Sequence, residues 1–223
     1  MSISPRVKAG GPRTILVINP NTNGGLTDRI RGQLSVRNAP DTAIEVTNPA
    51  EGPYSIETPA DRNTASAQVV ALVRAGPGRD AYVLACFDDV GVDEARRLVA
   101  APVLSMAQAA IEAAVETGER FTIVTTVDGQ VPAIEALLTK YGAGELGSVR
   151  ACRVGVADAA SRTAQAEALL DRQIVEAIRS DGSRTIVLGS GAYSGRADEL
   201  GARYGVSFVD GLAAAVDRVT GRR

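Results

Sequence analysis

The 223-residue sequence contains no histidine and only two cysteines. Without an imidazole, the chain cannot form a Ser-His-Asp triad, a Cys-His pair or an HExxH zinc site. Any proton transfer has to use thiol, carboxylate, amine, phenol or hydroxyl groups. Two cysteines at unrelated positions, in a chain without an export signal, favour reduced thiols over a disulfide, so we expect a cytoplasmic protein.

Other features are scarce as well. Aromatic residues make up 4% of the chain, and the net charge of −2 comes without a block of like charges, which argues against a nucleic-acid partner. No apolar run approaches the ~20 residues of a membrane-spanning helix, and the first residues lack a signal-peptide core. We expect residues 1–13 to form a flexible tail. We also expect that the protein does not bind a membrane.

Apolar segments alternate with helical patterns along the rest of the chain. The segments typical of strands are 14–18, 43–47, 82–85, 101–105, 121–126, 148–154, 186–189 and 206–210. The helical patterns include one beginning near residue 26 and others at 64–75, 106–118, 128–141 and 162–180. This alternation predicts an α/β fold with parallel sheets, right-handed crossovers and ligands bound beyond the carboxyl ends of the strands.

The two halves of the chain repeat one pattern. Cys86 and Ser190 each end an apolar strand and precede a glycine-containing turn, a helix and a further strand, and they are 190 − 86 = 104 residues apart. We interpret this as an internal duplication. A capping box at residues 105–108 marks the boundary. The prediction is two pseudo-symmetric subdomains, residues 14–105 with the C-terminal helix 211–223, and residues 106–210, with an active-site cleft between them.

Cys86 is the first candidate for chemistry. If a helix begins directly after it, the helix dipole and nearby backbone N–H groups lower its thiol pKa from ~8.5 towards neutrality. The alternative is a small buried residue without a chemical role. Cys152 is predicted to lie in the middle of a strand, which favours a structural role.

Polar turns after other strands are further candidates. Asn19, Asn21 and Thr22 could bind a small polar ligand, or form an Asx-rich turn that caps the next helix. Thr125 and Thr126 could donate to a carboxylate or a ring carbonyl, or serve as caps.

The acidic residues near Cys86 have a structural explanation. Asp88 and Asp89 are predicted in the first turn of a helix, where carboxylates oppose the dipole, and Asp93 and Glu94 on a solvated face of it. Tyr193 could contact a ligand in the cleft or wall it off from water.

Several stretches together resemble the aspartate/glutamate racemase superfamily, most closely its hydantoin and allantoin racemases. The similar stretches are residues 18–22, 84–91, 120–126, 186–189 and 210–214, in family order. The resemblance implies two four-stranded parallel sheets flanked by helices, and a racemase without cofactor or metal. It also implies a small-molecule substrate between two facing thiols, and, by analogy, a homo-oligomer. One thiolate removes the Cα proton, and the opposite thiol returns a proton on the other face.

Cys86 matches the first family cysteine, and Ser190 stands in place of the second. The resemblance implies substrate contacts from residues of the turns that follow the strands: Asn19, Asn21, Thr22, Phe87, Asp88, Thr125, Thr126, Gly189, Gly191 and Tyr193.

Two departures from the family pattern affect the chemistry. A serine hydroxyl is far harder to ionise than a thiol, and without histidine it has no evident general base. Asp88 adds a carboxylate beside Cys86 that could disfavour an anionic substrate. Turn 191–193 also differs from the Ala-Gly-Met that is typical of hydantoin racemases.

The sequence therefore predicts a racemase of a 5-substituted hydantoin or of allantoin, and leaves alternatives open. One is a decarboxylase or isomerase that uses a single thiol. Another is a variant impaired by exchange of a native cysteine for Ser190. A third is a ligand-binding module without catalysis.

Overall fold

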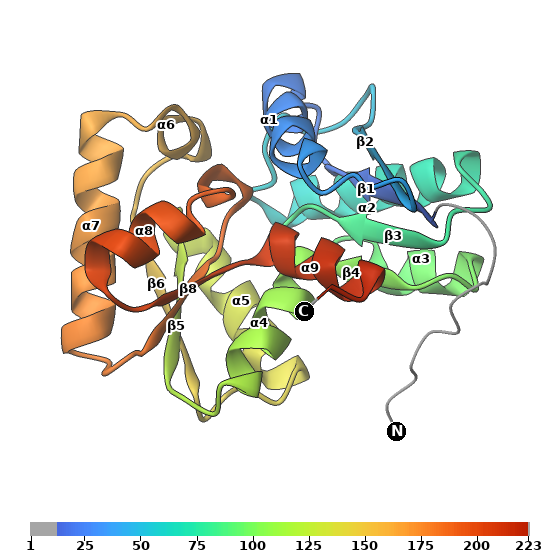
Figure 1. Ribbon diagram of the computed structural model, residues 1–223. Coiled ribbons are helices and arrows are strands. Elements are labelled where there is room, and N and C mark those ends of the chain that lie inside the picture. Colours follow the sequence, from blue (N-terminus) through green and yellow to red (C-terminus); the bar gives the residue numbers. More distant parts are fainter. Residues whose placement is uncertain (1–12, 223) are drawn as a thin grey trace.

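The computed structural model describes residues 13–222 and contains two sheets of four parallel strands each (Figure 1). The strand orders are β2-β1-β3-β4 and β6-β5-β7-β8, so the same order occurs twice. The predicted α/β fold with two pseudo-symmetric parallel sheets is confirmed. The predicted tail lies outside the described residues except for Arg13, which is the first residue of β1 and not part of a tail.

The first sheet consists of β1 (Arg13–Ile18), β2 (Thr42–Thr47), β3 (Ala81–Leu84) and β4 (Val103–Ser105). The second consists of β5 (Phe121–Thr125), β6 (Gly147–Ala151), β7 (Thr185–Leu188) and β8 (Ser207–Asp210). The central strands β3, β5 and β7 are buried along their whole length, which explains their continuous apolar sequence. The edge strands β2 and β6 are partly exposed and more polar.

Helices cover both faces of each sheet. The helices up to residue 116 are α1 (Gly24–Ser35), α2 (Pro59–Ala75), α3 (Val92–Leu98) and α4 (Met106–Glu116). The helices after residue 116 are α5 (Val131–Lys140), α6 (Val156–Ser161), α7 (Ala164–Arg179), α8 (Ala197–Tyr204) and α9 (Gly211–Thr220), with short 3-10 turns η1 (Asp128–Gln130) and η2 (Gly191–Tyr193).

Alternate residues of β1 point to different clusters. Ile15 and Val17 join a core that also contains residues of β5 and β7, whereas Leu16 and Ile18 pack under α2 and α3. The shared core contains residues of α1, α4, α5 and α9 and lies between the two sheets, and a separate cluster lies under α7 and α8. The two halves are therefore joined by apolar packing.

The backbone confirms that Cys86 and Ser190 are equivalent positions. The N–H of Ala85 donates to the carbonyl of Ile18 at 2.8 Å, and the N–H of Gly189 donates to the carbonyl of Val124 at 2.9 Å. Each bond joins the first residue after the third strand of its sheet to the first strand. Cys86 and Ser190 are the next residues along the chain.

The helices α4 and α9 pack against each other where the halves meet. Ser105 caps α4 and Asp210 caps α9, each from the end of the fourth strand of its sheet. A Cβ at Gly211 would collide with the carbonyl oxygen of Met106, so the close approach of the two helices requires glycine there. Helix α9 contacts β3 and β4 as well as β8 (Figure 1). The division of the chain at residues 105 and 106 stays a prediction.

Some local predictions are wrong. Ser105 accepts from the N–H of Gln108, but Gln108 Oε1 accepts from Arg96 and not from the Ser105 N–H, so the reciprocal half of the capping box does not form. The helix predicted for 162–180 begins only at Ala164, because Arg162 has a left-handed φ of 54° and ends the separate α6. Cys152 follows the last residue of β6 and does not lie within the strand.

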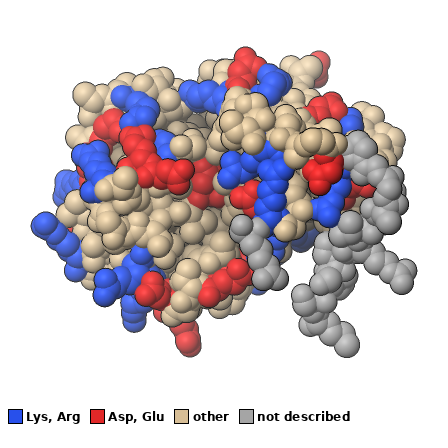
Figure 2. All heavy atoms as spheres, viewed as in Figure 1, with Lys and Arg blue, Asp and Glu red and all other residues tan. Residues whose placement is uncertain are grey.

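Acidic and basic side chains are intermixed over the visible face, without a stripe of one sign (Figure 2). Between residues 13 and 222, every helix is too short or too polar to span a lipid bilayer.

Candidate active site

A pocket of about 310 Å³ opens beside Cys86, at the carboxyl end of β3. Its wall comes from the turn before α2, the loop after β3, and η1 with the start of α5, so both halves of the chain contribute. The lining residues are Ile56, Glu57, Thr58, Pro59, Arg62, Cys86, Phe87, Asp88, Gly129, Gln130, Pro132, Ala133 and Ile134. Of the predicted site residues, the pocket brings together Cys86, Phe87 and Asp88.

Cys86 is half-buried and lies in a loop, because α3 begins only at Val92 after Gly91 in the left-handed conformation (φ 71°). The predicted lowering of its pKa by a helix start is therefore wrong. Burial raises the pKa of the Cys86 thiol, and the negative charge of Asp88 raises it further, while the guanidinium of Arg62 opposes this. The resting site holds a thiol at neutral pH.

Ser190 occupies the equivalent place in the second half and is buried, with 7% of its surface exposed. Its Oγ accepts from the N–H of Ala192 at 3.3 Å and caps η2. Among the hydrogen bonds of residues 13–222, none joins this hydroxyl to a carboxylate or an amine that could activate it. A Cβ at Gly191 would lie 3.9 Å from the carbonyl oxygen of Ala85, so the Ser190 and Cys86 loops meet.

Asp88 and Asp89 lie in the loop that precedes α3, not in its first turn as predicted. Asp88 forms an ion pair with Arg62, with 2.7 Å between carboxylate oxygen and guanidinium nitrogen. Burial raises the pKa of the Asp88 carboxyl, and the charge of Arg62 acts in the opposite direction. Arg62 therefore compensates the carboxylate that was expected to disfavour an anionic substrate.

Asp89 ties the Cys86 loop to the second half. Its buried carboxylate accepts from Ser105 Oγ at 2.6 Å, from Lys140 Nζ at 2.7 Å and from the hydroxyl of Tyr141. Burial and the hydrogen bond to Asp89 raise the pKa of the Tyr141 phenol. The loop that carries Cys86 is thus anchored to α5 through a charged side chain.

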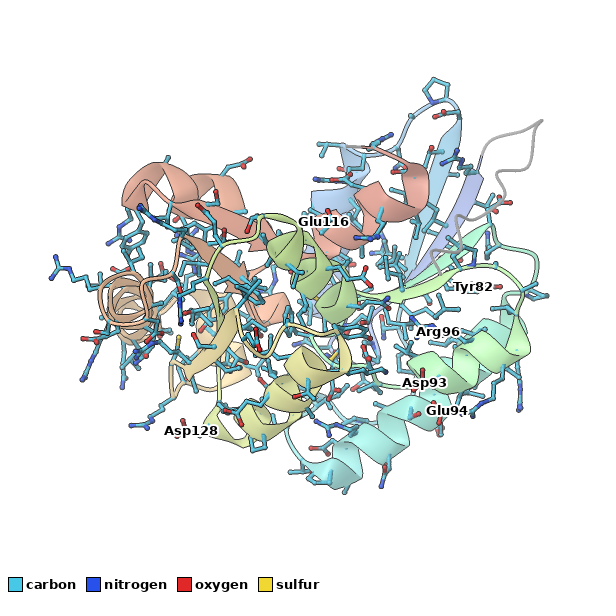
Figure 3. The ribbon with its side chains drawn as sticks, turned by 90° about the horizontal axis from the view of Figure 1, so that it is seen from below. Tyr82, Asp93, Glu94, Arg96, Glu116 and Asp128 are labelled. Carbon is cyan, nitrogen blue, oxygen red and sulfur yellow. The ribbon has the colours of Figure 1, made fainter. Side chains whose placement is uncertain are left out.

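Asp93 and Glu94 occupy the first turn of α3, and both are exposed, as predicted for a solvated face (Figure 3).

The asparagine turn after β1 has the contacts expected of an Asx-rich turn that caps the next helix. Asn19 is fully buried, and its Nδ2 donates to Asn21 Oδ1 and Thr27 Oγ1, both at 3.0 Å. Asn23 caps α1, and the N–H of Thr22 donates to the carbonyl of Pro53. The asparagines of this turn hydrogen-bond to one another, and none of the turn's residues lines the pocket.

Thr125 and Thr126 are buried and face Gln130. Their hydroxyls donate to Gln130 Oε1 at 2.7 and 3.4 Å, and Gln130 Nε2 donates to the carbonyl of Ile56 at 3.4 Å. The two threonines therefore hold a pocket residue and do not line the pocket themselves. Gln130 in turn connects the second half to the turn before α2.

Gly189 and Tyr193 are placed by packing. A Cβ at Gly189 would lie 2.5 Å from Ile123 Cγ2 and 3.0 Å from the carbonyl oxygen of Val124, so only glycine fits there. Tyr193 is 1% exposed and lies in the cluster under α7 and α8, so the expectation that it lines the cleft is wrong. Its neighbour Cys152 is also 1% exposed, as expected for a structural cysteine, and burial raises the pKa of that thiol to about 11.

Most residues of the pocket wall were not identified from the sequence, and two of these, Arg62 and Gln130, contact predicted site residues. Arg62 lies in the first turn of α2 and Gln130 in η1, and both are far from Cys86 along the chain. A cation at a helix N-terminus is electrostatically unfavourable. This unusual position is the feature of the sequence that could have indicated a functional role for Arg62. Among the described residues, no cluster of three acidic or cysteine side chains is arranged to hold a metal ion.

The doubled parallel α/β architecture, with a cysteine loop and its serine counterpart meeting between the halves, defines the racemase-like class of folds. Residues 15–219 match the Asp/Glu/hydantoin racemase family. The chain belongs to this family, which confirms the resemblance seen in the sequence and the expectation of a racemase-type isomerase.

Named relatives agree with this assignment. A hydantoin racemase of Rhizobium meliloti is 38% identical over 206 residues, which cover 91% of this chain and 85% of the relative. A hydantoin racemase of Paenarthrobacter aurescens is 33% identical, over 90% of this chain and 87% of the relative. The solved allantoin racemase of Klebsiella pneumoniae superposes with a TM-score of 0.89 at 34% identity, covering 94% of this chain and 86% of that one.

Proposed function

We propose that this chain racemises a five-membered cyclic ureide, either a 5-substituted hydantoin or allantoin. The observation that carries the proposal is the 38% identity to a hydantoin racemase across 91% of the chain. The likeness to the allantoin racemases of Klebsiella pneumoniae and Pseudomonas fluorescens supports the same kind of ring substrate. Racemisation requires that the proton on the ring Cα leaves from one face and returns on the other.

Cys86 is the proposed base and acid on one face. Its thiolate takes the Cα proton, and the electron pair of the broken C–H bond moves onto the neighbouring ring carbonyl as an enolate. Backbone N–H groups of the surrounding loops stabilise the enolate oxygen. Because the pKa of Cys86 is raised, the thiol has to give its own proton to water or hydroxide before this step.

Ser190 is proposed to face the stereocentre from the other side. The approach of the Gly191 backbone to Ala85 supports this placement. A hydroxyl can donate a proton or a hydrogen bond to the enolate, but it is a poor base without a partner to ionise it. The two enantiomers should therefore be deprotonated at unequal rates.

The test is exchange of the Cα proton in heavy water, followed by proton NMR. Both enantiomers of several 5-substituted hydantoins and of allantoin are compared, with free amino acids as controls. We expect one enantiomer to take up deuterium faster than the other. The absence of exchange from every hydantoin and from allantoin would overturn the proposal, and equal rates from both enantiomers would contradict the single-thiol mechanism.

We further propose that the reaction needs no cofactor or metal, so that a chelator leaves the exchange rate unchanged. A loss of activity on chelation would contradict this. The cytoplasmic location and the association of several copies stay predictions, and sedimentation of the purified chain tests the second.

A further inference from the structure

An ion pair forms part of the pocket wall next to Cys86. Arg62 comes from the first turn of α2, Asp88 comes from the loop after β3, and both line the pocket. Their charged groups lie 2.7 Å apart, with 40% of the Arg62 side chain and 18% of the Asp88 side chain exposed. A cation and an anion are therefore presented side by side to whatever occupies the pocket.

Folding alone does not account for Arg62. The first turn of a helix favours negative charge, so a guanidinium there is electrostatically unfavourable. Its Nε is buried without a hydrogen-bond partner among the described residues, and its terminal nitrogens have only the ion pair with Asp88. An arginine in this position leaves donor capacity unused at the pocket.

Asp88 complements this donor with an acceptor. Its Oδ1 accepts from the N–H of Asp89 at 2.8 Å, which fixes the carboxylate in the loop, while Oδ2 faces Arg62. Together the two side chains have no net charge. They fit a planar, uncharged group that combines an N–H donor for the carboxylate with a carbonyl acceptor for the guanidinium.

Groups of other chemistry fit this pair less well. A carboxylate would be attracted by Arg62 but repelled by Asp88, and an ammonium group would meet the opposite conflict. An alkyl group would remove water from both charges without replacing its hydrogen bonds, which is costly. The rest of the wall is mixed. Apolar residues such as Ile56, Pro59 and Phe87 suit the ring face or a methylene spacer, and Glu57, Thr58 and Gln130 are polar.

We propose that Arg62 and Asp88 together determine which substituent at the ring Cα this enzyme accepts, and that they favour a carboxamide or ureide over charged and alkyl groups. The proposal rests on the proposed function. It assigns a specificity-determining role to a pair whose acidic member departs from the family pattern.

Three hydantoins of nearly equal size test the proposal, with carbamoylmethyl, carboxymethyl and isobutyl substituents at the ring Cα. They are mixed in heavy water with the enzyme, and the ratios of kcat/KM for deuterium uptake are measured in competition. The wild-type enzyme should favour the carbamoylmethyl compound by about tenfold or more over each of the others, as expected for a site that hydrogen-bonds its substrate.

Two substitutions should shift these ratios in opposite directions. Asp88→Asn leaves Arg62 without its counter-charge and should raise the relative rate of the carboxymethyl compound by about tenfold. Arg62→Gln leaves Asp88 uncompensated and should lower that relative rate further. Arg74→Gln, an exposed arginine in the last turn of the same helix, is the matched control and should leave every ratio unchanged.

The outcomes separate the two proposals. Ratios are used because both pocket variants also change the pKa of Cys86, which affects all three compounds alike. Exchange from all three compounds without preference, or preferences that neither variant shifts, would overturn the specificity role and leave the racemase proposal standing. No exchange from any of them and none from allantoin would overturn the proposed function, and the specificity role with it.

Discussion

The loops that carry Cys86 and Ser190 begin at equivalent points of two equivalent sheets, yet they are held in place by different contacts. The Cys86 loop is held by charged side chains, since Asp88 pairs with Arg62 and Asp89 binds Lys140 from the other half. The Ser190 loop turns at once into η2, with Tyr193 buried in the core behind it, and its ion pair lies at its far end, where Arg196 binds Glu167 of the same half. Residues of the first loop line the pocket, and the second loop approaches it through the Gly191 backbone, which lies close to Ala85.

This difference shows that a repeated backbone need not repeat its chemistry. The hydrogen bonds of Ala85 and Gly189 are nearly the same in length, 2.8 and 2.9 Å. The side chains that follow differ in acidity, exposure and neighbours. Substitutions in the two loops should therefore have unequal effects on catalysis.

The largest effect is expected from Cys86→Ala. Removing the only thiol at the pocket should lower deuterium uptake roughly 10²–10⁴-fold, the usual contribution of a general base. NMR exchange rates of both enantiomers measure this. Cys152→Ala is the matched control, because Cys152 is buried away from the pocket, and it should retain exchange. Full activity of Cys86→Ala would remove Cys86 from the mechanism.

Ser190→Cys should make the two loops chemically alike. A thiol on the second face should raise the exchange rate of the slower enantiomer by about 10²-fold, since a thiol ionises far more readily than a hydroxyl. Chiral chromatography of the products follows the gain. Ser194→Cys, in the same loop, should bring none. An unchanged rate in Ser190→Cys would show that position 190 does not face the stereocentre.

The acidity of Cys86 can be read from its alkylation by iodoacetamide in a Cys152→Ala background. Because burial and Asp88 raise the thiol pKa, the rate should increase about tenfold per pH unit from about pH 7 to 9 without levelling off. A plateau near neutrality would instead support a thiol activated by its surroundings.

The buried thiols also give a stability prediction. The pKa of Cys152 is about 11 in the folded protein, above the ordinary ~8.5. The unfolded chain therefore loses this proton first as the pH rises, and the free energy of unfolding should decrease between about pH 8.5 and 11. Urea titrations across this range measure the decrease, which Cys152→Ala should reduce.

Asp89→Asn tests how the Cys86 loop is anchored. Loss of the charge that binds Ser105, Lys140 and Tyr141 should lower the free energy of unfolding by about 1–3 kcal/mol. Denaturant titration measures it. Asp93→Asn is the control, because that side chain is 56% exposed and should change stability by less than about 0.5 kcal/mol. Equal effects would mean that the anchoring contacts contribute little.

The smallest effect is expected from Tyr193→Phe. The hydroxyl is buried beside the thiol of Cys152, a weak hydrogen-bonding group, so its removal should change the free energy of unfolding by less than about 1 kcal/mol. Exchange rates should stay the same, because Tyr193 lies behind the Ser190 loop. A loss of exchange would show that Tyr193 takes part in substrate binding.

Much of the fold could be predicted from the sequence because strand burial leaves a direct pattern. The apolar runs of β1, β3, β5 and β7 and the shared spacing of Cys86 and Ser190 were sufficient to predict two equivalent parallel sheets. The cap at Ser105 likewise placed the start of α4 correctly. These features depend on neighbouring residues in the chain.

The environment of the site depends on residues that are distant in sequence, and this part was not predicted. Gly91 adopts a left-handed conformation and delays α3 to Val92, which moves Asp88 and Asp89 out of the helix and removes the dipole from Cys86. Whether Asp88 is paired depends on Arg62, and no local pattern reveals that contact. Tyr193 points into the core because of how η2 is oriented, and the apolar pattern of the strands does not predict that orientation.

The packing of α9 brings the beginning and the end of the described chain together. The guanidinium of Arg13, at the start of β1, donates to the carbonyl of Thr220, the last residue of α9. The two ends of the described chain are therefore neighbours, so the order of the two halves along the chain is not fixed by their arrangement in space. Circular permutation should therefore be tolerated. A short linker would join the two ends, and new termini would lie at the turn around Gly118. In the permuted chain the half with Ser190 would precede the half with Cys86.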